Sequence, residues 1–270
     1  MSTAFRLLEV TTLRATLALQ FLDPVLRTAV SDGLTATAWP VGDPNAAMVA
    51  RHSPVSSTLG FANLPGLLAY ETGRSAAPPS LPGPLGQFVV RTVDDRRRFL
   101  PTVQVIPVPQ VAVVTAMLFS APTRPAHPGF AAIRGEVWTS AGRPAGWAVV
   151  TLSQGTTPIQ ALADGQGRFA CYPPYPDALP PLAGSLPAGG SIDNLTWPVV
   201  VTVQCQPSVL LRPSGTGTAD PPELASILAQ GDATIEDAGL LVPSVSRVLR
   251  FGQPLAVASS GSTRLIVEPA

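Results

Sequence analysis

The chain has 270 residues, zero formal net charge, 13% charged residues and 46% hydrophobic residues. This hydrophobic fraction excludes a disordered chain, and the length allows one large or two ordinary domains. All 17 basic residues are arginines, and without a basic surplus we expect no nucleic-acid binding, which needs positive charge to neutralise phosphates.

The first half of the chain predicts several strands. Residues 13–21 alternate apolar and polar side chains, which is the period of a half-buried strand, and Asp23-Pro24 ends it. Asp32-Gly33 favours a tight turn into the next strand. A hairpin is expected further on, and its turn at 94–98 carries the only basic run, which we interpret as a solvated turn. The predicted strands and apolar runs are 13–21, 34–39, 87–93, 99–105 and 111–119.

The second half repeats this style of short strands between turns rich in glycine and proline. The expected strands are 131–139, 147–153, 158–163, 168–172, 197–204, 245–251, 255–258 and 263–267. Residues 74–86 and 173–190 are rich in proline and glycine and predict loops.

One short helix is predicted near residue 224. Asp220 is placed to cap it, Pro221 to occupy its first position and Glu223 to reach back to the cap. Residues 224–228 put their leucine and isoleucine side chains on one face, and Gly231 ends the turn. We expect this helix to cover an open end or edge of the second domain.

These elements predict an all-β protein of two tandem Ig-like or transthyretin-like β-sandwich domains, with one short helix in the second. We expect a first domain at 1–110, a stiff proline-rich connection at 111–128 and a second domain at 129–270. A pattern that occurs twice supports two modules. It consists of a small-residue turn, an alternating strand and a second turn with glycine and phenylalanine, at 30–39 with Gly60-Phe61 and at 142–152 with 164–169.

No catalytic, metal or cofactor residues are predicted. The two histidines, His52 and His127, are far apart in expected loops, and no Gly-x-Ser-x-Gly elbow of a hydrolase occurs. Most acidic residues lie at expected turns, where aspartate bonds its own backbone. A calcium site at Asp232, Glu236 and Asp237 and a pair of glycosidase carboxylates are alternatives that the sequence leaves open.

Cysteine and tryptophan leave two further alternatives. Cys171 and Cys205 lie in expected strands, where two buried thiols are favoured over a disulfide. The four tryptophans favour core packing, and an exposed platform that stacks on carbohydrate is the alternative. They are Trp39, Trp138, Trp147 and Trp197.

The N-terminal residues show no basic segment followed by an apolar one, so we expect no signal peptide. No apolar run reaches about 18 residues, so no membrane insertion is expected. We therefore expect assembly in the cytoplasm, and an extracellular location only after release by another route.

The second module resembles the carboxypeptidase regulatory-like family of β-sandwiches. Three stretches carry this resemblance, namely 133–137, 143–150 and 164–169, which read Ile-Arg-Gly-Glu-Val, Arg-Pro-Ala-Gly-Trp-Ala-Val-Val and Asp-Gly-Gln-Gly-Arg-Phe. The resemblance spans about residues 131–173 and implies a structural or binding module without catalytic residues.

Three further stretches resemble accessory proteins encoded with phage-tail-like contractile injection systems. They are 60–67, 93–101 and 118–125. The resemblance implies a non-catalytic structural component at a baseplate, cap or fibre attachment. Its partners would be other subunits of the particle, including further copies of this chain. The loops at 74–86 and 173–190 depart from that pattern. A carbohydrate- or surface-binding module is the alternative function, and a hydrolase with scattered catalytic residues is a third.

Overall fold

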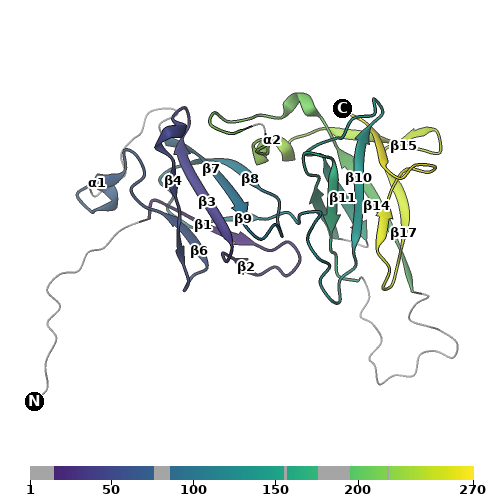
Figure 1. Cartoon of the computed structure of the whole chain (residues 1–270), viewed down its shortest axis with the longest axis horizontal. Helices are drawn as coiled ribbons and strands as arrows, with labels where there is room; N and C mark the ends of the chain where they lie inside the picture. The colour runs from purple at the N-terminus through teal and green to yellow at the C-terminus, as the bar shows by residue number, and fades with distance from the viewer. Residues whose placement is uncertain (1–14, 76–85, 155–156, 176–194, 218) are drawn as a thin grey trace, which may run out of the picture.

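The structure is a computed structural model, and it describes residues 15–75, 86–154, 157–175, 195–217 and 219–270. These residues form two units that lie side by side along the long axis of the molecule (Figure 1). The predicted all-β class is confirmed. The described residues contain many strands and two short α-helices, α1 (Leu68–Glu71) and α2 (Leu224–Leu228).

The first unit consists of two sheets that pack face to face. One sheet has the order β2-β1-β6-β5, with β9 parallel to β1, and the other has the order β4-β3-β7-β8. Their strands are β1 (Leu17–Leu22), β2 (Ala29–Val30), β3 (Leu34–Pro40), β4 (Met48–Val49), β5 (Arg51–Ser53), β6 (Thr58–Phe61), β7 (Gln87–Asp94), β8 (Thr102–Pro107) and β9 (Val114–Met117).

The alternation read from the sequence decides which side chains enter this core. Leu17, Leu19 and Phe21 of β1 are buried and pack against Phe88 of the opposite sheet. The predicted hairpin is also present, because β7 and β8 pair antiparallel in one register.

The second unit is one sheet that curls around a single core. Its order is β12-β11-β14-β15-β19-β10-β13, with β17 beside β14, β16 beside β15 and β18 beside β10. β12 and β13, at the two ends of this order, are in contact, so the sheet nearly closes on itself. Its strands are β10 (Ile133–Thr139), β11 (Val149–Gln154), β12 (Thr157–Leu162), β13 (Arg168–Cys171), β14 (Thr196–Gln204), β15 (Asp232–Asp237), β16 (Leu240–Val242), β17 (Val245–Arg250), β18 (Leu255–Val257) and β19 (Leu265–Glu268).

Several expectations need correction. Residues 111–128 are not only a connection, because β9 within them is a strand of the first sheet. Residues 232–237 were expected at a turn, but they form strand β15, whose buried positions alternate. His52 lies on strand β5 rather than in a loop.

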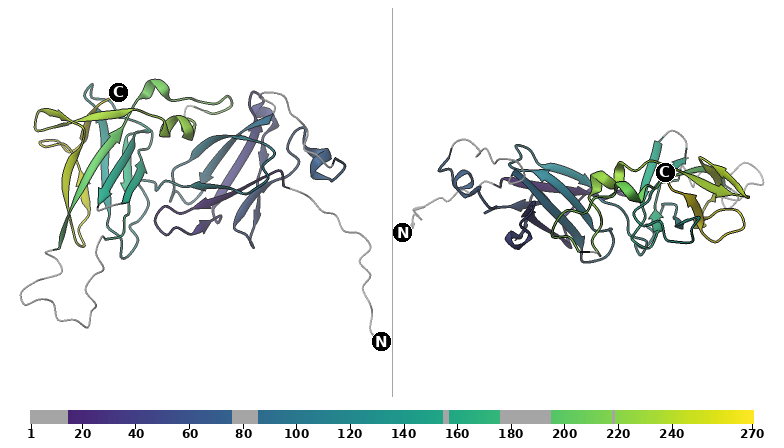
Figure 2. Two further views of the ribbon diagram at one scale, coloured as in Figure 1. Left: turned by 180° about the vertical axis from the view of Figure 1, so that it is seen from behind. Right: turned by 90° about the horizontal axis from the view of Figure 1, so that it is seen from above.

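The predicted helix is present, but it starts later than expected and covers a different surface. α2 starts only at Leu224, and Glu223 at its N-cap makes no side-chain capping bond. Asp220 instead accepts bonds from Gly217 N–H (2.9 Å) and the Arg91 guanidinium (2.6 Å). α2 lies between the two units rather than over an edge of the second, as the views from behind and above also show (Figure 2).

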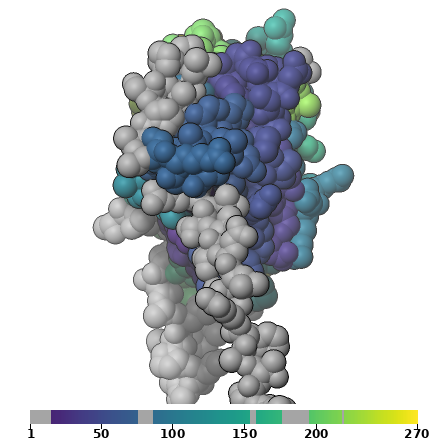
Figure 3. Space-filling view, turned by 90° about the vertical axis from the view of Figure 1, so that its left-hand side faces the viewer, coloured from purple at the N-terminus to yellow at the C-terminus, as the bar shows by residue number. Residues whose placement is uncertain are grey.

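Helix α1 was not predicted, and a buried carboxylate holds it in place. Glu71 is fully buried and accepts hydrogen bonds from Thr16 Oγ1 (2.9 Å) and from the N–H groups of Asn63 (2.5 Å) and Leu64 (3.3 Å). The helix therefore stays fixed to β1, at the outer end of the first unit (Figure 3). Within the described residues, no helix has both the length and the apolar character to cross a membrane.

The turn from Asp164 to Phe169 shows why a glycine is needed at position 167. The Asp164 carboxylate accepts bonds from the N–H groups of Gln166 (2.8 Å) and Arg168 (3.0 Å) and from the Arg168 guanidinium. Gly167 has a φ of +77°, and a Cβ there would lie 2.3 Å from the Val137 carbonyl oxygen. Glycine at this position therefore lets the turn approach the β10 backbone closely, just before β13 pairs with β10.

We therefore expect Gly167→Ala to lower the free energy of unfolding by about 3 kcal/mol or more, since it adds a backbone clash to the cost of a positive φ. Gly142→Ala is the matched control, because Gly142 also has a positive φ of +73° but open space around it. That control should cost only about 1 kcal/mol. Urea unfolding measures both, and equal losses would contradict this account of the turn.

Candidate interaction site at the junction of the two units

A buried ion pair lies where the two units meet. Asp23 follows β1, and Arg124 lies in the segment that enters the second unit. The guanidinium donates two bonds to the carboxylate, Nη1 to Oδ1 at 3.1 Å and Nη2 to Oδ2 at 2.8 Å. Their side chains are only 8% and 6% exposed. This bidentate geometry is the strongest form of such a pair and fixes both partners in direction.

Backbone groups complete the surroundings of Asp23. Its Oδ1 also accepts bonds from the N–H groups of Val25 (2.7 Å) and Leu26 (3.3 Å). Burial raises the pKa of Asp23, but the hydrogen bonds and the charge of Arg124 outweigh burial, so the pKa lies below its usual value. The carboxylate is therefore ionised at neutral pH and is held by its partners.

Arg124 also joins aromatic side chains from both units. Its guanidinium lies 4.9 Å from the ring centre of Phe99 in the first unit and 6.0 Å from that of Tyr172 in the second. Its carbonyl accepts bonds from the Tyr172 hydroxyl and from Arg134 Nη2 (3.1 Å). One residue thus contacts the loop after β1, the β7–β8 turn and the second unit.

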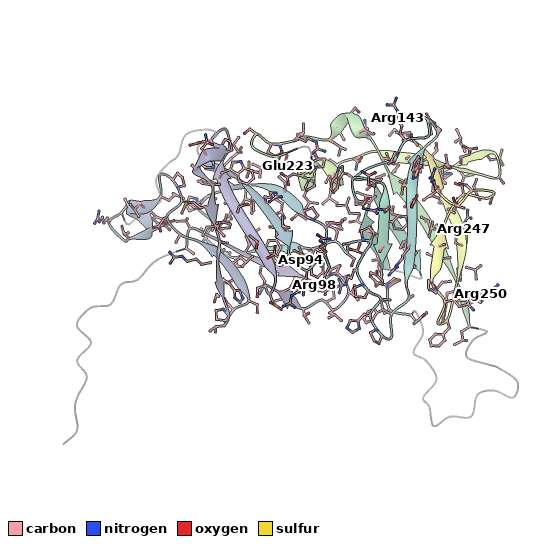
Figure 4. The ribbon with its side chains drawn as sticks, in the orientation of Figure 1. Asp94, Arg98, Arg143, Glu223, Arg247 and Arg250 are labelled. Atoms are coloured by element: carbon pink, nitrogen blue, oxygen red, sulfur yellow. The ribbon has the colours of Figure 1, made fainter. Side chains whose placement is uncertain are left out.

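The basic run 96–98 is only partly the solvated turn that the sequence predicted. Arg96 and Arg97 lie at the surface, but Arg98 packs inward and pairs with Asp94 at 2.9 Å (Figure 4). Asp94 is almost fully buried. Burial raises its pKa, yet the bonds from the Arg98 side chain and backbone outweigh burial and lower it. This pair supports the turn that carries Phe99.

Apolar packing extends the junction. Leu100 and Phe119 of the first unit form one buried cluster with Trp147, Leu162 and other residues of the second. A further small cluster contains Tyr172. Burial of this surface stabilises the contact between the units by roughly 25 cal/mol per Å² of apolar area.

A second contact lies at the other side of the junction. Residues 207–217 and 219–223 of the second unit reach back to the first, where Trp39 Nε1 donates to the Ser214 carbonyl (3.0 Å) and Gly42 N–H donates to Ser214 Oγ (3.1 Å). Glu223, which is labelled in Figure 4, forms an isolated parallel bridge with Val103 of β8. The units therefore touch at two separated places, which restrains their relative rotation.

Between these contacts lies a groove of about 570 Å³. Its walls come from the first unit (β9 and the loop after β1) and from the second unit (β12 and α2). Most of its lining side chains are uncharged, and Arg27 at its rim is the exception. Grooves at the meeting point of two units are common sites for ligands and for partner proteins.

The histidines are not brought together. His52 is exposed, and its Nε2 lies 2.7 Å from Ser31 Oγ, but among the described residues no carboxylate bonds the other ring nitrogen. His127 is exposed and contacts the edge of the Phe130 ring at 5.6 Å. In the part of the chain that the structure describes, no three or more His, Cys, Asp or Glu side chains gather to hold a metal ion.

The other residues singled out in the sequence lie mainly in the cores. Trp39, Trp147 and Trp197 are buried, whereas Trp138 is half-buried under the Arg264 guanidinium at 3.6 Å. The alternative prediction of an exposed platform of several tryptophans is therefore wrong for the described surface. Two of the acidic residues expected at turns, Asp177 and Asp193, lie outside the described residues.

Both cysteines are buried free thiols. Cys171 and Cys205 belong to the core of the second unit. Burial raises the pKa of the Cys171 thiol to about 12 and that of the Cys205 thiol to about 11. The interpretation of the sequence as two buried thiols is therefore confirmed.

The sequence analysis missed the junction pair. Asp23 was interpreted only as the end of a strand, and Arg124 only as part of a proline-rich connection. The available signal was a single arginine among prolines and alanines at a unit boundary, where a charge needs a partner.

No family model matches the chain, and no curated protein matches it either. A solved structure, that of the Bacillus anthracis TIE protein, is similar over 87% of this chain with a TM-score of 0.25 and 11% identity. The chain covers 43% of that structure, so it spans less than half of its length. A similarity at this level carries no argument about fold or function.

Removal of one residue of the Asp23–Arg124 pair should destabilise the fold strongly. Arg124→Ala leaves the Asp23 carboxylate buried without its counter-charge, so we expect the free energy of unfolding to fall by about 3–5 kcal/mol. Arg96→Ala is the control, because its pair with Asp32 is exposed (58% and 70%), and such pairs contribute about 0–1 kcal/mol. Urea unfolding at neutral pH measures both variants. A small loss for Arg124→Ala would show that the pair does not hold the junction.

The same pair gives a dependence on pH. Because the pKa of Asp23 is lower in the folded state, its stabilisation is present above the unfolded pKa of about 3.9 and is lost as the pH falls through the folded value. We expect the free energy of unfolding of Asp23→Asn to fall less steeply than that of the wild type as the pH drops below about 4. Asp32→Asn, at an exposed position, is the control and should fall as steeply as the wild type. Unfolding curves at several acidic pH values give the slopes, and an unchanged slope for Asp23→Asn would refute the assignment.

Proposed function

We propose that this chain is a non-catalytic structural component of a phage-tail-like contractile injection particle. In this proposal it acts through protein–protein contacts at a baseplate, cap or fibre attachment, and it is present in several copies. Its partners are the neighbouring subunits of the particle.

The observation that carries the proposal is the position of the stretches that resemble accessory proteins of contractile injection systems. Two of them, 93–101 and 118–125, are bonded to each other at the junction, where Leu100 N–H donates to the Phe119 carbonyl (2.8 Å). The second stretch also supplies Arg124. The two stretches that carry this resemblance therefore lie at the junction of the units, and this supports a mechanical role for them.

The remaining features agree with such a role. The two contacts between the units favour a stiff body, and a surface with few charges suits close contact with other proteins more than long-range repulsion. The Asp164 turn, with its bonded carboxylate and tightly packed glycine, supports the likeness of the second unit to carboxypeptidase regulatory-like modules. Carbohydrate binding through tryptophan has less support, because Trp39, Trp147 and Trp197 are buried.

Particles purified from the native host test this function directly. We expect mass spectrometry to find this chain in a fixed ratio to the sheath and tube proteins, and to find it still bound after a density-gradient step. Sheath and tube proteins recovered from intact particles without this chain would contradict the proposal. An abundant soluble host protein, measured in the same fractions, controls for carry-over.

A further inference from the structure

The hairpin of β15 and β16 has a rigid tip. Its turn consists of Ala238 and Gly239, with φ values of +50° and +78°, between the paired residues Asp237 and Leu240. Two residues with positive φ are what a tight two-residue hairpin turn requires. Asp237 is in turn bonded by Arg247 (2.7 Å) and by Ser260 N–H (2.6 Å). The tip is therefore fixed to the body of the second unit.

This tip exposes two leucines. Leu240 is 66% exposed and Leu241 is 62% exposed. The hairpin lies at the outer end of the second unit, away from the junction, in the front and rear views (Figures 1 and 2). Because the two leucines follow one another on β16, their side chains point to opposite faces of the hairpin, so the projection carries one large exposed apolar side chain on each face.

The junction groove has the size and chemistry to receive such a tip. Met117, Phe119, Ile159 and Leu228 are among its lining residues. A cavity of about 150 Å³ with apolar walls already holds a benzene-sized group. The groove of about 570 Å³ therefore has room for two leucine side chains.

The charges of the two surfaces are complementary. Among the described residues that line the groove, only Arg27 is charged; it is exposed and makes no ion pair with any other described residue. On the hairpin, Glu236 pairs in register with Leu241, is exposed, and likewise makes no ion pair within the described ranges. Opposite charges at the rim of a contact favour association and fix its register.

We propose that Leu240 and Leu241 of one copy insert into the junction groove of a second copy, with Glu236 of the first facing Arg27 of the second. The hairpin lies at the outer end and the groove at the junction, so a chain does not fill its own groove. The contact is heterologous, because it joins two different surfaces, and it builds a ring or a filament according to the rotation between copies. It rests on the hairpin and the groove alone and does not depend on membership of a particle.

Sedimentation of the full chain from micromolar to submillimolar concentration tests this contact. We expect the wild type to form dimers and larger species, and Leu240→Glu/Leu241→Glu to raise the dissociation constant by at least about ten-fold. Val55→Glu is the matched control, because Val55 is 96% exposed in the loop between β5 and β6 of the other unit. It should associate like the wild type, and circular dichroism checks that each variant is folded.

A mixing experiment tests the head-to-tail geometry. Leu228→Glu blocks the groove but leaves the hairpin intact, so this variant and the hairpin variant should each stay monomeric alone. Mixed together they should form a dimer, because one supplies a groove and the other a hairpin. Arg27→Glu should weaken association, and adding Glu236→Arg to it should restore association.

The proposal is overturned by a wild type that stays monomeric throughout, by a hairpin variant that associates like the wild type, or by mixed variants that do not form a dimer. These outcomes differ from failure of the proposed function, which is decided by the composition of purified particles. A chain that self-associates but is missing from particles would keep the contact and refute the particle role.

Discussion

The arrangement of this molecule depends on one buried ion pair at the meeting point of its two units. Asp23 and Arg124 are nearly inaccessible to water, so each needs the other, and the cost of separating them is far greater than for a surface pair. Around Arg124 the chain places Phe99 from one unit and Tyr172 from the other. The pair therefore converts two β-rich units into one body whose surfaces have a fixed relation to each other.

The sequence predicted much of the fold, because strands with one buried face alternate in composition. Residues 17–22 overlap the alternating run 13–21 and residues 196–204 are rich in β-branched residues, and the burial of both strands alternates. It could not predict β15, because acidic residues occupy three of its six positions, as in a turn, and only Ala233 and Ile235 mark its buried face. Nor could it predict the junction, because the partners of Arg124 are distant in the chain and are brought close only by tertiary packing.

The candidate site follows from the junction rather than from a chemical motif. Joining two units leaves a groove between them, and a rigid hairpin at the opposite end carries apolar side chains of a size that fits such a groove. A body with a receiving surface and a projecting one is suited to repeated contacts with other subunits. Such an arrangement agrees with a structural role, and the proposed contact between copies names the side chains that would form it.

The most direct test of the account is a distance between the two units in solution. Spin labels at Val55→Cys and Val248→Cys lie on exposed positions of the first and second units, and the native cysteines are buried. Pulsed electron paramagnetic resonance should give one narrow distance distribution in the otherwise wild-type chain and a broad one after Arg124→Ala. A broad distribution with Arg124 in place would contradict the claim that the buried pair fixes the two units as one body.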